Sequence, residues 1–161
     1  MKRNNKTSLL TKSGAIAALY VVLTLLAKVF GLDSGQIQLR LSEALCVLPV
    51  FLPAAVPGLT IGCLLANLLC GNIIWDVVFG TLATLLGAIG TRLLRKRPLL
   101  ALLPPILSNT IIVPFVLAYA YCLPGSVPFF MLTVGIGEVL SCGLLGSLLY
   151  STLDKHKNQL F

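Results

Sequence analysis

The chain has 161 residues, of which 57% are hydrophobic and only 11% are charged, and its net charge is +7. A soluble domain carries roughly 25% charged residues, so this composition excludes a water-soluble globular protein. The apolar runs are continuous rather than alternating, which excludes a membrane β-barrel and predicts transmembrane helices. At about 20 residues per span, the length fits one bundle of six short helices and no soluble domain of any size.

We predict an all-α integral membrane protein, a six-transmembrane-helix bundle in a single domain over residues 1–161. Four apolar segments predict ordinary spans, at about 13–30, 76–91, 99–121 and 129–151. The second and third segments share residues 43–70, where several prolines indicate broken helices. These residues are too few for two ideal spans, so either two short spans or a re-entrant hairpin accounts for them.

The basic residues predict the orientation, because Lys and Arg are retained on the cytoplasmic side. Ten of the twelve lie in residues 1–12, 92–97 or 152–161, and only Lys28 and Arg40 fall at or near the outer side. Both termini are therefore expected to be cytoplasmic tails in the cell (inner) membrane. The positive charge is explained by topology and lipid headgroups, so we expect no nucleic-acid partner.

Four polar residues at or near membrane depth are candidate ligand contacts, because such groups are costly in lipid and usually face a cavity or a partner. Glu138 lies near the middle of the last span; it either binds a ligand or pairs with a helix-end Arg. Asn109, in mid-span, either bridges two helices or contacts a ligand. Asn67 either caps a helix end or contacts a ligand. Asp76 opens a span, where the helix dipole favours an acid, so a structural role is favoured there.

Residues 36–43 alternate polar and apolar side chains, which predicts an extended segment that covers the outer mouth as a lid. Within it, Arg40 and Glu43 either pair with each other or present a donor fork and a carboxylate to a solute. In the predicted topology, Arg40, Glu43, Asn67 and Asp76 lie toward the outer face, and Asn109 and Glu138 lie at the midplane. Carboxylate and amide groups suit a neutral planar heterocycle with an amide-like edge, so we expect a pocket for such a molecule, open to the outside.

Other kinds of chemistry find little support in the sequence. It contains no Cys/His metal pattern, no Ser/His or Cys/His arrangement and no GxxxxGK[ST] phosphate loop. The five cysteines are expected to be packing residues. We therefore expect no catalytic residue, metal or cofactor and no ATPase activity of the chain itself, which disfavours an intramembrane enzyme that uses Glu138 or Asp76 as acid or base.

Several strings along the chain carry a family resemblance. They are IQLRLSEAL at 37–45, LP at 48–49 followed by PAAVPGL at 53–59, IGCLLAN at 61–67, DVVFGTLAT at 76–84, LPP at 103–105 with Asn109, and VGIGE at 134–138. Together they resemble the QueT-type queuosine-precursor transporter family, the substrate-binding S components of energy-coupling factor transporters. The resemblance implies a six-helix subunit that captures a 7-deazaguanine outside, whether the cyano or aminomethyl precursor or free queuine.

The resemblance also implies partners, namely a transmembrane coupling protein and two ATPase subunits that drive release inside. In S components generally, a small-xxx-small patch on the first helix docks the coupling protein. Ser13, Gly14, Ala17 and Ala18 offer such a patch, and the alternative is packing within the chain. The alternative function is an autonomous secondary transporter or channel that acts as an oligomer.

Overall fold

The structure is a computed structural model, and it describes residues 5–32, 39–98 and 100–156. Within these residues the chain is all-helical, with six α-helices and no β-strand. In chain order the elements are α1 (Asn5–Val29), the 3₁₀ helix η1 (Leu41–Val50), α2 (Ala55–Leu69), α3 (Ile74–Leu93), the 3₁₀ turn η2 (Leu100–Leu102), α4 (Leu103–Phe115), the π-helical segment η3 (Val116–Ala120), α5 (Val127–Glu138), the π-helical segment η4 (Val139–Leu145) and α6 (Gly146–Lys155).

Four continuous helical stretches are long and apolar enough to cross a membrane. They are Lys6–Val29, Ile74–Leu93, Leu100–Ala120 and Val127–Lys155, and they correspond to the four ordinary spans expected from the sequence. The third of them ends in the π-helical segment η3, and the last joins α5 to α6 through the π-helical segment η4, where one extra residue enters a turn.

The expectation of two short helices within residues 43–70 is confirmed, as η1 and α2. The 15 residues of α2 extend only about 22 Å at 1.5 Å per residue, less than the roughly 30 Å hydrocarbon core. Whether each of these helices crosses the bilayer remains a prediction.

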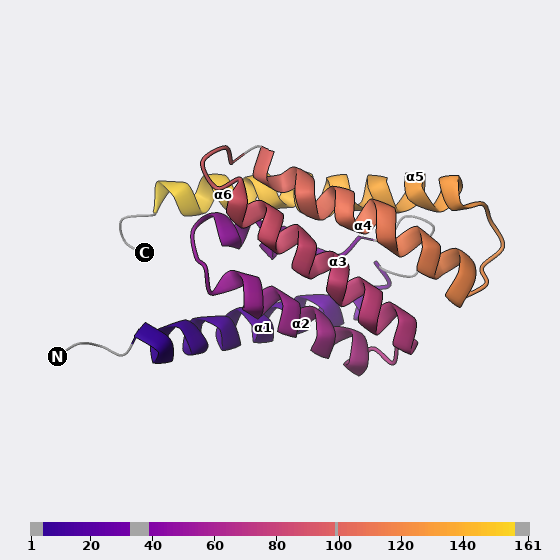
Figure 1. Ribbon diagram of the computed structural model, residues 1–161, viewed down its shortest axis with the longest axis horizontal. Coiled ribbons are helices and arrows are strands. Elements are labelled where there is room, and N and C mark those ends of the chain that lie inside the picture. The colour runs from indigo at the N-terminus through magenta and orange to yellow at the C-terminus, as the bar shows by residue number, and fades with distance from the viewer. Residues whose placement is uncertain (1–4, 33–38, 99, 157–161) are drawn as a thin grey trace.

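The helices pack side by side as an elongated bundle, and consecutive long segments run in opposite directions (Figure 1). The start of α1 and the end of α6 lie at the same end of the bundle, on the left in Figure 1, as does the turn after α3. The basic tails and the basic turn expected in the cytoplasm are thus attached to one common end.

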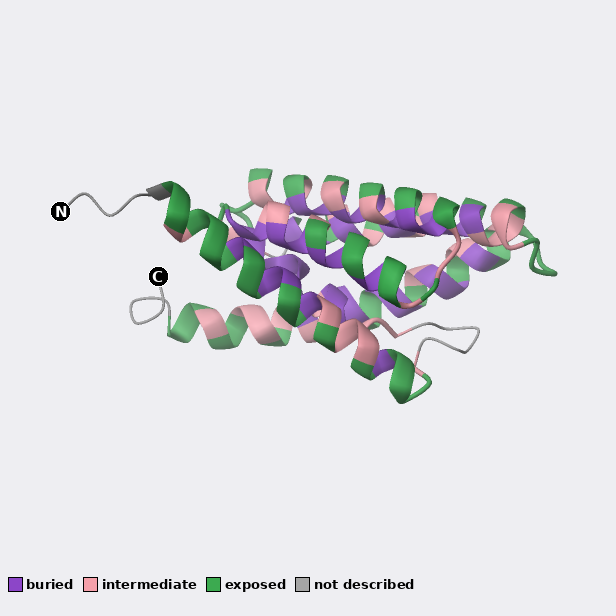
Figure 2. Cartoon of the chain, turned by 90° about the horizontal axis from the view of Figure 1, so that it is seen from below, coloured by how far each residue is buried: buried purple, intermediate pink, exposed green. Residues whose placement is uncertain are grey.

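The outer surface of the bundle is strongly apolar. Purple buried faces point toward neighbouring helices, and green exposed faces point outward (Figure 2). Large hydrophobic side chains dominate those exposed faces; Val29, Leu107 and Leu132, for example, are 81%, 55% and 63% exposed. Lipid tails can cover such a surface, whereas in water it would drive aggregation.

Small residues bring neighbouring helices into close contact. A Cβ added to Gly62 of α2 would lie 2.7 Å from Cβ of Tyr20 in α1. A Cβ added to Gly87 of α3 would lie 2.7 Å from Cα of Pro105 in α4. The lack of a side chain at Gly87 therefore allows α3 to pack closely against α4.

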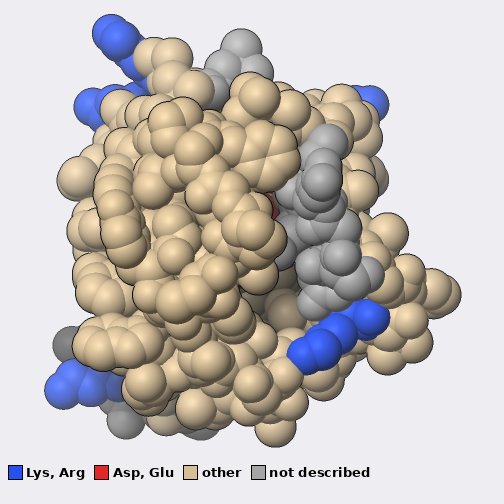
Figure 3. All heavy atoms as spheres, turned by 90° about the vertical axis from the view of Figure 1, so that its right-hand side faces the viewer, with Lys and Arg blue, Asp and Glu red and all other residues tan. Residues whose placement is uncertain are grey.

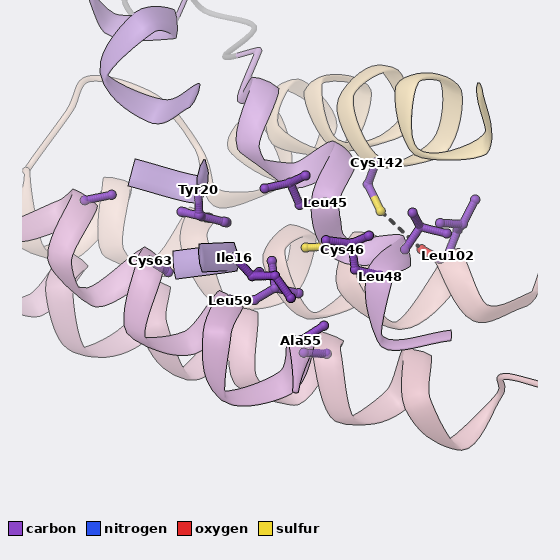
Figure 4. Close-up of a cluster of buried hydrophobic side chains, with 13 residues drawn as sticks. Ile16, Tyr20, Leu45, Cys46, Leu48, Ala55, Leu59, Cys63, Leu102 and Cys142 are labelled. Atoms are coloured by element: carbon purple, nitrogen blue, oxygen red, sulfur yellow. Dashed lines mark hydrogen bonds between the residues drawn. The ribbon is translucent and has the colours of Figure 1, made fainter. Parts of the chain in front are cut away.

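The core between these helices includes three of the cysteines (Figure 4). Cys46, Cys63 and Cys142 are all buried, and the Cys142 thiol faces the Leu102 carbonyl oxygen at 3.9 Å. All five cysteines are free thiols, and the expectation of packing residues holds for these three but not for Cys122, which is exposed, while Cys70 is half-buried.

One sequence-based expectation about the backbone is wrong in part. Leu41, Ser42 and Glu43 form the start of η1 and not the end of an extended lid, and residues 36–38 of that segment lie outside the described residues. The alternation of polar and apolar residues is misleading here because Ser42 and Glu43 are both fully buried, and each has a hydrogen-bond partner on α1.

The common end of the basic segments leads to a prediction about orientation. A cysteine in the variant Arg95→Cys, in the turn after α3, should react with a membrane-impermeant thiol reagent only after the membrane is opened, since this end should face the cytoplasm. Native Cys122 is exposed, lies just before α5 at the opposite end and should react in intact cells. Mass spectrometry of the labelled peptides distinguishes the two sites. Labelling of position 95 from outside would refute the orientation.

Candidate functional site

A polar cavity of about 220 Å³ lies at the end of the bundle opposite the termini. Its lining comes from four regions of the chain: Tyr20, Thr24 and Ala27 of α1; Arg40 and Ser42 at the start of η1; Asn67, Cys70, Asn72 and Asp76 around the α2–α3 turn; and Leu117, Tyr121 and Leu123 after α4. Seen from this end, most of the surface is neither acidic nor basic, and a small acidic area is visible in a hollow (Figure 3).

Asp76 and Asn67 both line this cavity, and both also make structural contacts. Asp76 lies in the first turn of α3, and its Oδ2 accepts a hydrogen bond of 3.2 Å from the Tyr121 hydroxyl. Asn67 Oδ1 accepts one of 3.2 Å from Asn72 Nδ2. Gly71 allows the chain to reverse direction between α2 and α3 because it adopts φ +71°, the left-handed conformation that ends many helices.

Close approach of α2 to α3 depends on Gly80. A Cβ added there would lie 3.1 Å from Asn67 Nδ2 and 3.5 Å from Asp76 Oδ1. The missing side chain therefore lets the amide and the carboxylate lie side by side at the cavity wall. Together they offer both donor and acceptor groups to a solute.

Glu43 lies outside the cavity lining, although the sequence placed it with the candidate contacts. Its side chain is fully buried, and both carboxylate oxygens have partners. The Tyr20 hydroxyl donates to Oε1 at 2.6 Å, and the Cys46 thiol donates to Oε2 at 3.0 Å. Glu43 thus joins α1 to η1. Its hydrogen bond with Arg40 runs through the backbone, from the Glu43 N–H to the Arg40 carbonyl oxygen at 3.0 Å.

Glu138 and Asn109 are brought together deeper in the bundle. Glu138 is the last residue of α5 before η4 and is 5% exposed, while Asn109 lies within α4 and is 1% exposed. The two side chains lie close enough to interact, yet by bond geometry Glu138 Oε2 and both amide atoms of Asn109 have no hydrogen-bond partner among the described residues. A buried polar atom without a partner costs about 1–3 kcal/mol, so these groups are poised to accept a ligand or a water molecule.

Arg40 connects the two regions. Its side chain lines the 220 Å³ cavity and also a void of about 10 Å³ that it shares with Val113, Val134 and Glu138. It interacts electrostatically with Asp76 and Glu43, and Glu138 interacts with it in turn. A single guanidinium therefore interacts with three carboxylates, and it offsets part of their negative charge within the apolar bundle.

The four residues expected at a docking face divide into two pairs. Ser13 and Ala17 are buried: the Ser13 hydroxyl donates to the Ala54 carbonyl at 2.9 Å, and Ala17 lies against Gly62. Gly14 and Ala18 are exposed, and a Cβ added to Gly14 would have no atom of the described residues within 4 Å. One pair packs against α2, and the other remains available on the outer face of α1.

Two tyrosines at the site were missed by the sequence analysis. Tyr20 is 2% exposed in the middle of an apolar helix, and Tyr121 follows η3. A buried tyrosine hydroxyl usually needs a partner, so a tyrosine within a predicted span was the signal that could have located a buried acceptor.

The contact between Tyr20 and Glu43 predicts a stability effect. Tyr20→Phe keeps the ring and removes one of the two donors to the fully buried Glu43 carboxylate, so it should lower the unfolding free energy by about 1–3 kcal/mol. Thermal or denaturant unfolding of the purified protein in detergent measures this change. Tyr119→Phe is the control, because Tyr119 is 74% exposed, and it should leave the unfolding midpoint unchanged. Equal stability of Tyr20→Phe and the parent protein would contradict the proposed role of the bond.

Comparison with known proteins gives two matches. A family model described as QueT transporter matches residues 10–155. The chain is also 36% identical over 84 residues to a protein of Lactococcus lactis subsp. cremoris (strain MG1363) named queuosine precursor transporter QueT; the alignment covers 52% of this chain and 48% of that relative. The matched region thus spans about half the length of the relative. No solved structure matches the chain. Since the family match extends over nearly all of the helical bundle, the chain belongs to the QueT transporter family.

Proposed function

We propose that this protein is the substrate-binding membrane subunit of an ATP-driven uptake system, and that its substrate is a queuosine precursor of the 7-deazaguanine class. The family assignment supports this proposal, as does the name of the Lactococcus lactis relative. In the proposed arrangement the protein spans the cell membrane, captures its substrate from outside and depends on other subunits for energy.

The observation that carries the proposal is a polar cavity inside an apolar bundle. In lipid, a cavity with a carboxylate, a guanidinium and amides is costly unless it serves a solute. Its volume of about 220 Å³ is below the roughly 300–1,000 Å³ of sites for drug-sized ligands, which favours a single small heterocycle. Asn67 and Asp76 supply donors and acceptors to such a molecule, and the Arg40 side chain lines the same cavity.

Glu138 and Asn109 supply the specificity in this proposal. A carboxylate accepts hydrogen bonds only, whereas an amide accepts on one atom and donates on the other. Together they match a ring N–H, an exocyclic amine and a carbonyl, the three groups on one edge of a deazaguanine. Their unpartnered atoms support this assignment over a purely structural role.

The proposed partners are a transmembrane coupling protein and two ATPase subunits. The exposed pair Gly14 and Ala18 supports a docking surface on α1, because small side chains allow another helix to approach closely. Ser13 and Ala17 face α2 and would support that surface from within.

The first prediction of this proposal concerns Glu138. Glu138→Gln keeps the shape of the side chain but places an N–H against a ligand donor, which should cost about 1–3 kcal/mol. The dissociation constant for the best-bound deazaguanine should therefore rise by about fivefold to over a hundredfold. Titration calorimetry with the cyano precursor, the aminomethyl precursor and queuine measures this effect and identifies the preferred ligand.

The control for this titration is Asp154→Asn, the same chemical change on an exposed acid in α6. Its affinity should equal that of the parent protein. If Glu138→Gln binds as tightly as the parent, the carboxylate is structural. If the parent protein binds none of the three compounds, the proposed substrate class is wrong.

The second prediction concerns the docking surface. Gly14→Leu and Ala18→Leu should leave the deazaguanine affinity unchanged but abolish ATP-driven uptake, because the bulky side chains block a helix contact remote from the cavity. Val78→Leu, on the exposed face of α3, is the control and should retain uptake. Radiolabelled uptake by cells, together with co-purification of the ATPase subunits, provides the measurement.

Two outcomes would contradict this second prediction. Loss of deazaguanine binding in Gly14→Leu would assign that face to internal packing. Uptake by proteoliposomes that contain the purified protein alone would favour the alternative, an autonomous transporter or channel.

A further inference from the structure

The deepest polar groups of the site are not in contact with its open cavity. Glu138 and Asn109 are absent from the lining of the 220 Å³ cavity, and Glu138 lines only the void of about 10 Å³. That void has room for about one water molecule and no heterocycle. A ligand that enters the cavity therefore cannot reach the unpartnered atoms unless a side chain moves.

Arg40 is the side chain that lines both spaces. The remaining residues of the small void are Val113 on α4 and Val134 and Glu138 on α5, which belong to helices of the bundle. Arg40 precedes η1 and lies outside any helix. Among the residues that line the void, Arg40 is thus the one whose side chain can move without a change in helix packing.

The backbone and the side chain of Arg40 are held differently. The backbone N–H donates to Ser141 Oγ at 3.1 Å, and the carbonyl accepts from Glu43 N–H at 3.0 Å, so the main chain is fixed on both sides. In the described part of the chain, no direct hydrogen bond or ion pair joins the guanidinium to a carboxylate. The Arg40 side chain can therefore rotate while its backbone stays in place.

Carboxylates on both sides lower the free-energy cost of such a rotation of the side chain. Asp76 lies on the wall of the outer cavity and Glu138 on the wall of the inner void, and both interact electrostatically with Arg40. A guanidinium that leaves Glu138 moves toward Asp76 and does not become an isolated buried charge. The carboxylate it leaves is then free to accept hydrogen bonds from a ligand.

We propose that Arg40 is a movable partition that covers an inner subsite formed by Glu138 and Asn109, and that it swings toward Asp76 when the hydrogen-bonding edge of a planar heterocycle enters. This inference rests on the proposed function for the identity of the ligand, but not for the existence of the partition. Arg40 is on this view a positioning residue, which admits only molecules whose donors replace the guanidinium beside Glu138.

The test of the partition needs no ligand. Val134→Cys places a thiol on the wall of the inner void, where Val134 is 9% exposed. In the otherwise native protein, this thiol should react slowly with a small methanethiosulfonate reagent. A covered state typically opens for about 0.1–10% of the time, so the further change Arg40→Ala should raise the rate of reaction by about tenfold to a thousandfold.

The matched control is Val77→Cys, because Val77 is 3% exposed on α3 and lines neither space. Its labelling rate should not change with Arg40→Ala, and mass spectrometry separates both positions from the native cysteines. An unchanged rate at position 134 would overturn the proposal. An equal rise at positions 134 and 77 would overturn it too, because the effect would then be a general loosening of the bundle.

A second measurement ties the partition to the ligand. Addition of the preferred deazaguanine should slow the labelling of the thiol at position 134 in the Arg40→Ala background. If the compound binds but the labelling rate at position 134 does not change, the inner subsite is overturned. If no deazaguanine binds the parent protein while Arg40→Ala still exposes position 134, the proposed substrate is wrong and the partition stands. The proposed substrate class and the proposed partition are therefore tested by different experiments.

Discussion

Glu43 is fully buried in a bundle whose outer surface suits lipid, and a carboxylate in that position is tolerated only where donors surround it. The hydroxyl of Tyr20 and the thiol of Cys46 supply those donors, at 2.6 and 3.0 Å. Because Tyr20 belongs to α1 and Glu43 to η1, this bond fixes where η1 begins, and with it the position of Arg40. The wall of the cavity and the wall of the inner void therefore both depend on one buried acid.

Irregular helices place the remaining polar groups. Glu138 is the residue at which α5 gives way to the π-helical η4, and the π-helical η3 leads from α4 into Tyr121. Such segments are rare and frequently occur at functional sites, because the extra residue redirects side chains that a regular helix would turn elsewhere. Pro114 adds to this irregularity, since it cannot donate to the carbonyl of Thr110 beside Asn109.

Much of the fold follows from the sequence for simple physical reasons. Long apolar runs must be helical in lipid, and this requirement alone locates α1, α3 and the two joined stretches that contain α4 and α5. It also locates Asn109, Glu138 and Asp76 as costly groups that need a cavity or a partner. Glycines recur on one side of α3 in a pattern that is typical of a helix packing face, namely Gly80, Gly87 and Gly90.

Other features depend on tertiary contacts that no local pattern encodes. The alternation of residues 36–43 suggested an extended segment, yet Ser42 and Glu43 are both buried because α1 offers each of them a partner. Arg40 and Glu43 were expected to act together, but Tyr20 and Cys46 satisfy the carboxylate. Ser13 and Gly14 are neighbours in sequence with similar small side chains, and only the position of α2 decides which of them is exposed.

The helix α1 carries two surfaces that are separate in space but belong to one rigid element. Tyr20 and Thr24 face the cavity and η1, whereas Gly14 and Ala18 face outward nearer the end where the chain begins. Among the described residues, a Cβ at Gly14 meets no atom within 4 Å, so a bulky side chain on the outward face has no contact there through which it could crowd the cavity. Conversely, the loss of the Tyr20 hydroxyl alters the support of Arg40 without changing the outward face. The proposed binding surface and the proposed docking surface are therefore physically separable on this helix, which is the arrangement required if one subunit recognises the solute and another supplies the energy.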